Sequence, residues 1–84
     1  MAVFAVILNE PNNEAWTALK KWEQHFILTD RIAFVVEDDA TITRDISNPL
    51  GMNKDGKVKG IVIEMTNRSG WNDIALNEWL EKVS

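Results

Sequence analysis

The chain has 84 residues, no cysteine and a formal net charge of −4. Its length leaves no room for a second domain of ordinary size, and its 45% hydrophobic and 26% charged residues are typical of a globular protein rather than a disordered one. The absence of cysteine excludes disulfides, thiolate metal sites and cysteine nucleophiles, so we expect one domain over residues 1–84 that is held together by packing alone.

The first predicted element is a strand over Val3 to Leu8, because these residues form an uninterrupted apolar run that ends at Asn9-Glu10-Pro11. A strand that is apolar on both faces is typical of the centre of a sheet. The same run, counted from Ala2, is too short to cross a bilayer and has no basic residue before it. We therefore expect no membrane segment, no signal peptide and a cytoplasmic location.

A helix is predicted after this strand, with Asn12 or Asn13 as its N-cap and Glu14 in its first turn, where the helix dipole favours an acid. Its apolar residues recur with the helical period on one side: Ala15, Ala18, Leu19 and Trp22. A helix that follows a buried strand after so short a connection is typical of the beginning of a βαβ unit.

Two further strands are predicted over 26–29 and 32–36, with Asp30-Arg31 as the turn between them. Neither turn residue is Gly or Asn, which disfavours a tight hairpin turn, so one long bent strand is the alternative.

The segment 41–46 fits two structures. Ile42 and Ile46 have helical spacing, with Asp39 or Thr41 as a cap, whereas Thr-Ile-Thr alternates like a strand. We predict a helix that packs both isoleucines on the sheet face that the first helix covers.

The last two predicted elements are a strand over 57–65, with a bulge at Gly60, and a helix that begins at Asn72 after a hydrophobic staple from Trp71. The apolar arc of this helix is wider than one sheet contact requires, and consists of Ile74, Ala75, Leu76, Trp79, Leu80 and Val83. We therefore expect the helix to cover the open edge of the preceding strand or to contact a second subunit, with Trp71 or Trp79 approaching it.

Taken in order, these elements predict an α+β fold. The first six have the βαββαβ order of a ferredoxin-like sheet, to which the last helix is an addition. If 41–46 is a strand instead, the order becomes a βαβββα meander.

Short motifs over nearly the whole chain are also similar to those of a known protein family. They are Phe4 to Asn9, Ala15 with Leu19 to Trp22, His25 to Asp30, Ala33 to Val36, Thr41 to Ile46, Ile61 to Glu64, Ser69 to Trp71 and Asn77 to Leu80. In these motifs the sequence resembles the SinR-like group of small bacterial proteins, which are related in fold to the small CRISPR-associated endoribonuclease and to VapD-type toxins. The resemblance implies a ferredoxin-like fold.

The resemblance also bears on a metal site. In the nuclease relatives an aspartate near the end of the first strand binds a divalent metal at the dimer interface, but Asn9 stands at the matching position here. Asparagine is a weak, neutral ligand for a hard cation. Glu10 with Asp38 or Asp39 would be needed to complete an oxygen site for Mg²⁺ or Mn²⁺, whereas such acids are more often solvated or capping.

Two tryptophans are candidate binding residues. Trp16 and Trp71 lie at the flanks of their predicted helices, where an indole is commonly part of an interface or of a ligand wall. Packing at the edge of the core is the alternative for each, and we favour it.

Three lysines, Lys54, Lys57 and Lys59, form a local basic patch or a solvated turn around Asp55-Gly56. The rest of the charge disfavours nucleic acid as a partner, because the first 40 residues carry seven acids against three bases and the remainder carries six of each.

These observations predict a non-catalytic binding or regulatory module that forms a homodimer, needs no cofactor and takes a protein partner. The alternative is a metal-dependent nuclease or toxin of the kind found among the fold relatives. His25 is the only histidine, and no serine or cysteine pattern accompanies it, which favours the non-catalytic hypothesis.

Overall fold

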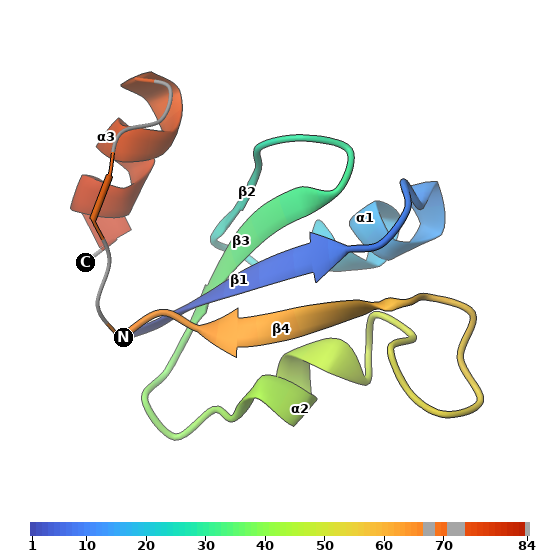
Figure 1. The fold of residues 1–84 in the computed structure, drawn as a ribbon. Helices are drawn as coiled ribbons and strands as arrows, with labels where there is room; N and C mark the ends of the chain where they lie inside the picture. Colours follow the sequence, from blue (N-terminus) through green and yellow to red (C-terminus); the bar gives the residue numbers. More distant parts are fainter. Residues whose placement is uncertain (67–68, 71–73, 84) are drawn as a thin grey trace.

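The computed structural model describes residues 1–66, 69, 70 and 74–83, which form a four-stranded sheet and three helices (Figure 1). In chain order the elements are β1 (Ala2–Leu8), α1 (Asn13–Leu19), β2 (His25–Ile27), β3 (Ile32–Glu37), α2 (Thr43–Ser47), β4 (Gly60–Glu64) and α3 (Ile74–Val83). The predicted start of the last helix, at Trp71 and Asn72, lies outside the described residues.

The sheet confirms the ferredoxin-like prediction. Its strands lie in the order β2-β3-β1-β4 with every neighbouring pair antiparallel, so β1 is central, as its apolar run predicts. α1 connects β1 to β2 across β3, and α2 connects β3 to β4 across β1, which is the split βαβ arrangement. Because residues 43–47 are helical, the alternative meander with a strand at 41–46 is wrong.

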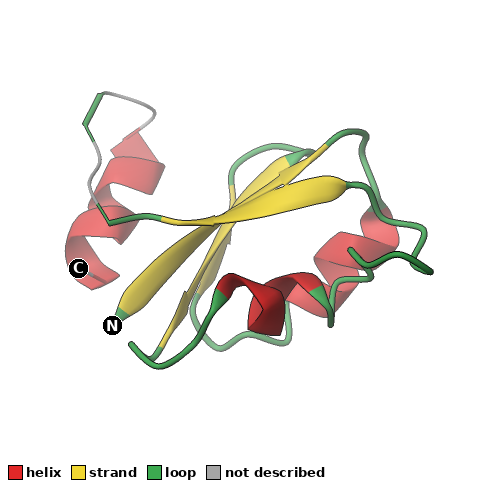
Figure 2. Cartoon of the chain, turned by 60° about the horizontal axis from the view of Figure 1, so that its bottom comes forward, coloured by secondary structure: helices red, strands yellow, loops and turns green. Residues whose placement is uncertain are grey.

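The main core lies between the sheet and the helices α1 and α2, which cover the same face (Figure 2). β1 supplies every second side chain to this core, because successive side chains of a strand point to opposite faces. The buried members of the core are Ala2, Phe4, Val6, Leu8, Ala15, Trp16, Leu19, Ala33, Val35, Ile46 and Leu50.

Side-chain hydrogen bonds determine where α1 and α2 begin. Asn12, one of the two predicted caps of α1, accepts a hydrogen bond from a backbone N–H of the first turn at 3.0 Å. Neither Asp39 nor Thr41 caps α2, because the chain enters this helix at Ile42, whose N–H donates to the Asp45 carboxylate at 3.0 Å. The predicted cap is therefore correct for α1 and wrong for α2.

Two apolar side chains lie differently from the prediction. α1 ends at Leu19, so Trp22 lies beyond the helix, although it still packs against the main core. Ile46 of α2 is fully buried, as predicted, whereas Ile42 is 55% exposed because it precedes the helix instead of forming part of it.

The connection between β2 and β3 is a turn that needs no glycine. The Thr29 hydroxyl oxygen accepts hydrogen bonds from the N–H groups of Arg31 and Ile32, at 3.1 and 3.0 Å. These two hydrogen bonds stabilise the turn without glycine or asparagine. Two separate strands therefore form, and the alternative of a single bent strand is wrong.

β4 is shorter than predicted and contains no bulge at Gly60. Gly60 begins the strand in a continuous register, opposite Leu8 of β1. A Cβ atom at this position would lie 2.4 Å from the backbone oxygen of Ile7, so the close approach of the two strands requires glycine here.

α3 packs on the opposite face of the sheet from α1 and α2 (Figures 1 and 2). The Trp79 ring lies 5.7 Å from the ring of Phe26 and 6.4 Å from that of Phe34, between ring centres. A second, smaller core joins Val3, Val36 and Val83 with Met65, Trp79 and Leu80. Trp79 therefore packs on its own sheet, and the prediction that α3 covers the outer edge of β4 is wrong.

Candidate functional site

The acidic residues predicted for a metal site lie at opposite ends of the sheet. Glu10 follows the end of β1, whereas Asp38 and Asp39 follow β3, whose Glu37 pairs with Ala2 at the beginning of β1. β1 is seven residues long, so roughly 20 Å separates its two ends. The structure does not bring the three carboxylates together, and the residues that it describes include no group of three or more His, Asp or Glu side chains suited to a metal ion.

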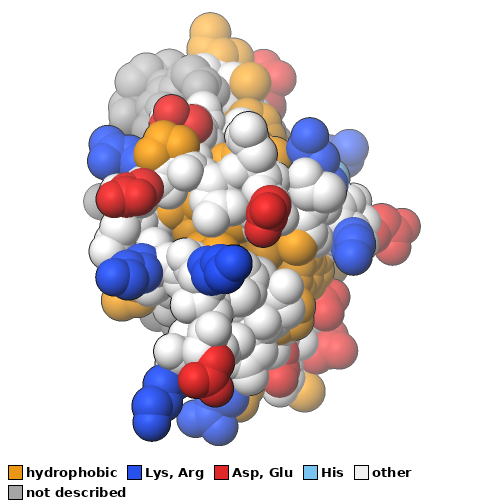
Figure 3. Space-filling view, turned by 90° about the vertical axis from the view of Figure 1, so that its right-hand side faces the viewer, with side chains coloured by type: hydrophobic (Ala, Val, Ile, Leu, Met, Phe, Trp, Pro, Cys, Tyr) orange, Lys and Arg blue, Asp and Glu red, His pale blue; other side chains and the backbone are white. Residues whose placement is uncertain are grey.

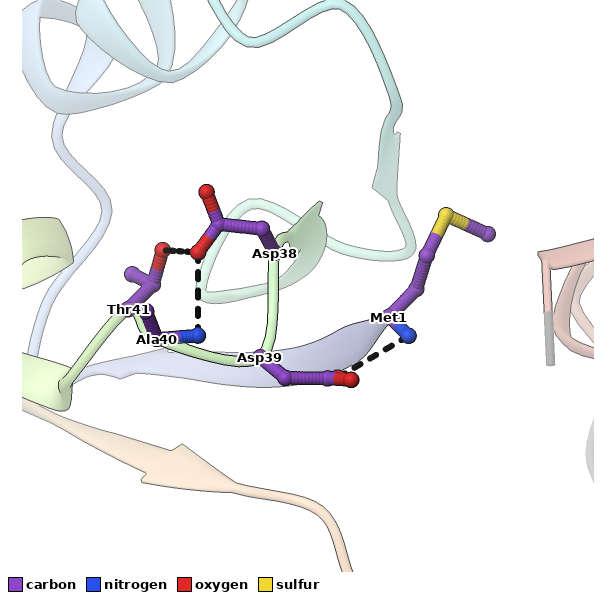
Figure 4. Close-up of polar contacts among 5 residues, drawn as sticks. All are labelled: Met1, Asp38, Asp39, Ala40 and Thr41. Atoms are coloured by element: carbon purple, nitrogen blue, oxygen red, sulfur yellow. Dashed lines mark hydrogen bonds and ion pairs between the residues drawn. The ribbon is translucent and has the colours of Figure 1, made fainter.

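Asp38 and Asp39 have local partners instead (Figure 4). One carboxylate oxygen of Asp38 accepts hydrogen bonds from the Ala40 N–H at 3.0 Å and from the Thr41 hydroxyl at 3.1 Å. The Asp39 carboxylate lies 2.9 Å from the amino group of Met1, in an ion pair between exposed groups. These contacts shape the connection from β3 to α2, and an exposed pair of this kind contributes little stability.

Glu10 lies beside two of the candidate basic residues. The Asn9 N–H donates to the Lys59 backbone oxygen at 2.9 Å, which holds the loop before β4 alongside the end of β1. A small pocket of about 170 Å³ lies there, lined by Glu10, Pro11, Asn12, Lys57, Val58 and Lys59. Figure 3 views this side of the molecule and shows acidic and basic side chains interspersed over it. A carboxylate among ammonium groups favours neither a divalent cation nor a phosphate.

A larger pocket of about 410 Å³, which the sequence did not predict, lies on the side of the sheet that α1 and α2 cover. Its lining comes from three distant parts of the chain and consists of Ala18, Lys21, Trp22, Glu23, Glu37 and Pro49. Trp22, which lies beyond the end of α1 at Leu19, is the aromatic residue of this lining, and its carbonyl oxygen lies 2.8 Å from Nδ1 of His25. The volume suits a small ligand, but the charges around the pocket are mixed and exposed.

Of the remaining candidate binding residues, the structure describes Trp16 and Lys54. Trp16 is only 7% exposed and belongs to the main core, which agrees with the packing role that the sequence analysis favours for it. Its indole N–H has no hydrogen-bond partner among the described residues. Trp71 lies outside those residues. Lys54 is exposed in a turn where the Asn53 carboxamide oxygen accepts from the Asp55 N–H at 3.1 Å.

The most distinctive surface is an uncovered part of the sheet. Ile7, Ile61 and Ile63 are 37%, 55% and 45% exposed, and they lie on the face opposite α1 and α2, beyond the part that α3 covers. Ile7 pairs with Ile61, and Ile63 pairs with Ala5, so the three side chains are neighbours. We call these three residues the open face. Single exposed apolar residues are normal on proteins, whereas a contiguous group on one sheet face is typical of an interaction surface.

Comparisons with known proteins found no relative of this chain. No protein-family model, no curated protein and no solved structure matches it. Within the described part of the chain, no helix is both long enough and apolar enough to cross a membrane. The function of the chain therefore has to be inferred from its own surfaces.

Proposed function

We propose that the chain is a small cytoplasmic, non-catalytic binding or regulatory module that acts as a homodimer through its open face. The observation that carries this proposal is the exposure of three neighbouring isoleucines on a regular sheet surface. The open face has no charged member, so it is complementary to a second copy of itself.

The size of the apolar contact supports self-association. Complete burial of an isoleucine side chain stabilises by about 1.5 to 3 kcal/mol, so covering the exposed fractions of the open face on two subunits contributes roughly 4 to 8 kcal/mol. Association itself costs an estimated 4 kcal/mol or more, depending on the reference state. The open face therefore offsets the cost of association, and a micromolar dimer needs some further contact besides it.

The arrangement of the acids supports the non-catalytic part of the proposal. Asp38 and Asp39 are engaged in local contacts at one end of the sheet, and Glu10 lies among lysines at the other. The observed strand order is also the one expected from the resemblance to SinR-like proteins, and we propose kinship with that group on this basis.

A pair of matched substitutions tests the proposal. Ile61 and Ile42 are both 55% exposed, but Ile61 belongs to the open face, whereas Ile42 lies at the beginning of α2. In sedimentation over a range of micromolar concentrations, we expect the parent protein and Ile42→Lys to reach twice the 9.6 kDa monomer mass, and Ile61→Lys to remain monomeric. A parent protein that stays monomeric, or equal behaviour of the two variants, would contradict the proposal.

A further inference from the structure

The outer edge of β4 has a defined set of backbone groups without partners in the sheet. The Met65 N–H donates to the Val3 oxygen at 2.8 Å, and the Lys59 oxygen accepts from Asn9. Hydrogen-bonded and non-bonded residue pairs alternate along an antiparallel ladder. The backbone N–H and C=O groups of the odd-numbered residues of β4 therefore point toward β1. The N–H and C=O groups of Gly60, Val62 and Glu64 therefore point away from β1, and no backbone hydrogen bond found outside the sheet ladders among the described residues uses them.

This edge also lacks the features that keep sheet edges from pairing. Natural edge strands are commonly very short, interrupted by proline or a bulge, or covered by another element. β2, at the other edge, has only three residues, whereas β4 has five, with neither proline nor a bulge in its register with β1. Its central residues, Ile61 to Ile63, carry no charge.

We infer that two copies of the chain pair antiparallel along β4, about a two-fold axis at Val62, to form one continuous eight-stranded sheet. This inference rests on the proposed homodimer and specifies its geometry: the two open faces meet side by side instead of covering each other completely, and the backbone hydrogen bonds of the edge supply the further contact that the dimer needs. Only residues with outward backbone groups can form the bonded pairs, so Val62 faces Val62 of the second copy, and Gly60 faces Glu64. Each of these facing pairs exchanges two hydrogen bonds.

The side chains select this register over its neighbours. With the axis at Val62, Ile61 of one copy lies opposite Ile63 of the other, and the two open faces merge into one apolar strip. Glu64 then lies opposite Gly60, which has no side chain, so the two carboxylates do not face each other. A shift of the axis to Ile63 places Glu64 opposite Val62 and removes one bonded pair. The edge is therefore complementary to itself, which favours a second copy over an unrelated strand.

Proline at position 62 separates edge pairing from any other dimer. Val62→Pro removes an N–H that bonds nothing within the subunit, and proline is tolerated on an edge strand where its nitrogen faces outward. The central pair loses both of its hydrogen bonds, which corresponds to a dimer about thirty-fold weaker. Val62→Ala is the matched control, because it shortens the same half-buried side chain and keeps the N–H. If Val62→Pro does not fold, Glu64→Pro changes an exposed residue with the same backbone orientation.

Amide exchange of the dimer gives an independent measurement. We expect the amides of Gly60, Val62 and Glu64 to exchange as slowly as those of Ile61 and Ile63, which face β1. A dimer that persists in Val62→Pro, or in which the three outward amides exchange freely, overturns edge pairing while the homodimer stands. A parent protein that is monomeric at every concentration overturns both.

Discussion

Removal of the Trp79 side chain tests whether α3 belongs to its own sheet or to a partner. Trp79 is half-buried, and its ring contacts those of Phe26 and Phe34 at 5.7 and 6.4 Å. Truncation of a fully buried tryptophan to alanine costs about 3 to 5 kcal/mol. For this half-buried ring with two aromatic contacts, we expect Trp79→Ala to lower the free energy of unfolding by about 2 to 3 kcal/mol.

α3 itself depends on this contact. It has ten residues, and an isolated helix shorter than about 12 to 15 residues is marginal in water. We therefore expect faster amide exchange throughout α3 in Trp79→Ala, together with a fall in Tm of roughly 8 to 24 °C for a domain of this size. Ile74→Ala is the matched control on the same helix, because Ile74 is 64% exposed and its truncation should change stability by no more than about 0.5 kcal/mol.

The oligomeric state of the same variant decides between the two roles of α3. If α3 covers its own sheet, its release uncovers Phe26 and Phe34 on the same side as the open face, and self-association becomes stronger. If α3 is the subunit contact, the variant dissociates. A Trp79→Ala protein with an unchanged Tm that sediments as a monomer would refute our reasoning.

Three further predictions concern single residues. Gly60→Ala should lower the free energy of unfolding by about 1 to 3 kcal/mol, because its Cβ would lie 2.4 Å from a backbone oxygen of β1, and an unchanged urea midpoint would contradict this. Asn12→Ala should cost about 1 kcal/mol through loss of the helix cap, while Asn13→Ala, in the same turn, should leave the urea midpoint nearly unchanged. Titration with Mg²⁺ should leave the amide NMR signals of Glu10 and Asp38 in place, because these two acids do not share a metal site. Saturable shifts of both signals, or magnesium-dependent RNA cleavage that is lost in Glu10→Ala, would contradict this.

The order of elements could be predicted because each one leaves a periodic signal in the sequence. The apolar run of β1 and the helical spacing in α1 and α2 are local patterns, and the structure confirms the elements that they predict. The errors lie at element ends, where one side-chain bond decides the outcome. Thr29 closes a turn that composition disfavours, and Asp45 moves the start of α2 so that Ile42 stays outside the helix.

The metal hypothesis, taken as a site within one subunit, conflicts with the fold that the same sequence predicts. A ferredoxin-like sheet requires β1 and β3 to be antiparallel neighbours, so residues that follow the two strands lie at opposite ends of the sheet. Glu10 follows β1, and Asp38 follows β3. The topology alone therefore separates these carboxylates within one subunit, whatever their side chains do.

The open face could not be predicted, because a sequence does not show which of its apolar surfaces the chain itself covers. The run from Ile61 to Ile63 is apolar on both faces, which is the pattern of a strand buried on both sides. In the structure α1 and α2 provide one cover, and Val62 packs beneath it. The other cover, α3, lies toward the far end of that face and leaves Ile61 and Ile63 about half exposed. A strand whose sequence is suited to burial on two sides, but which one subunit covers on only one, has the composition expected of a strand that takes part in association.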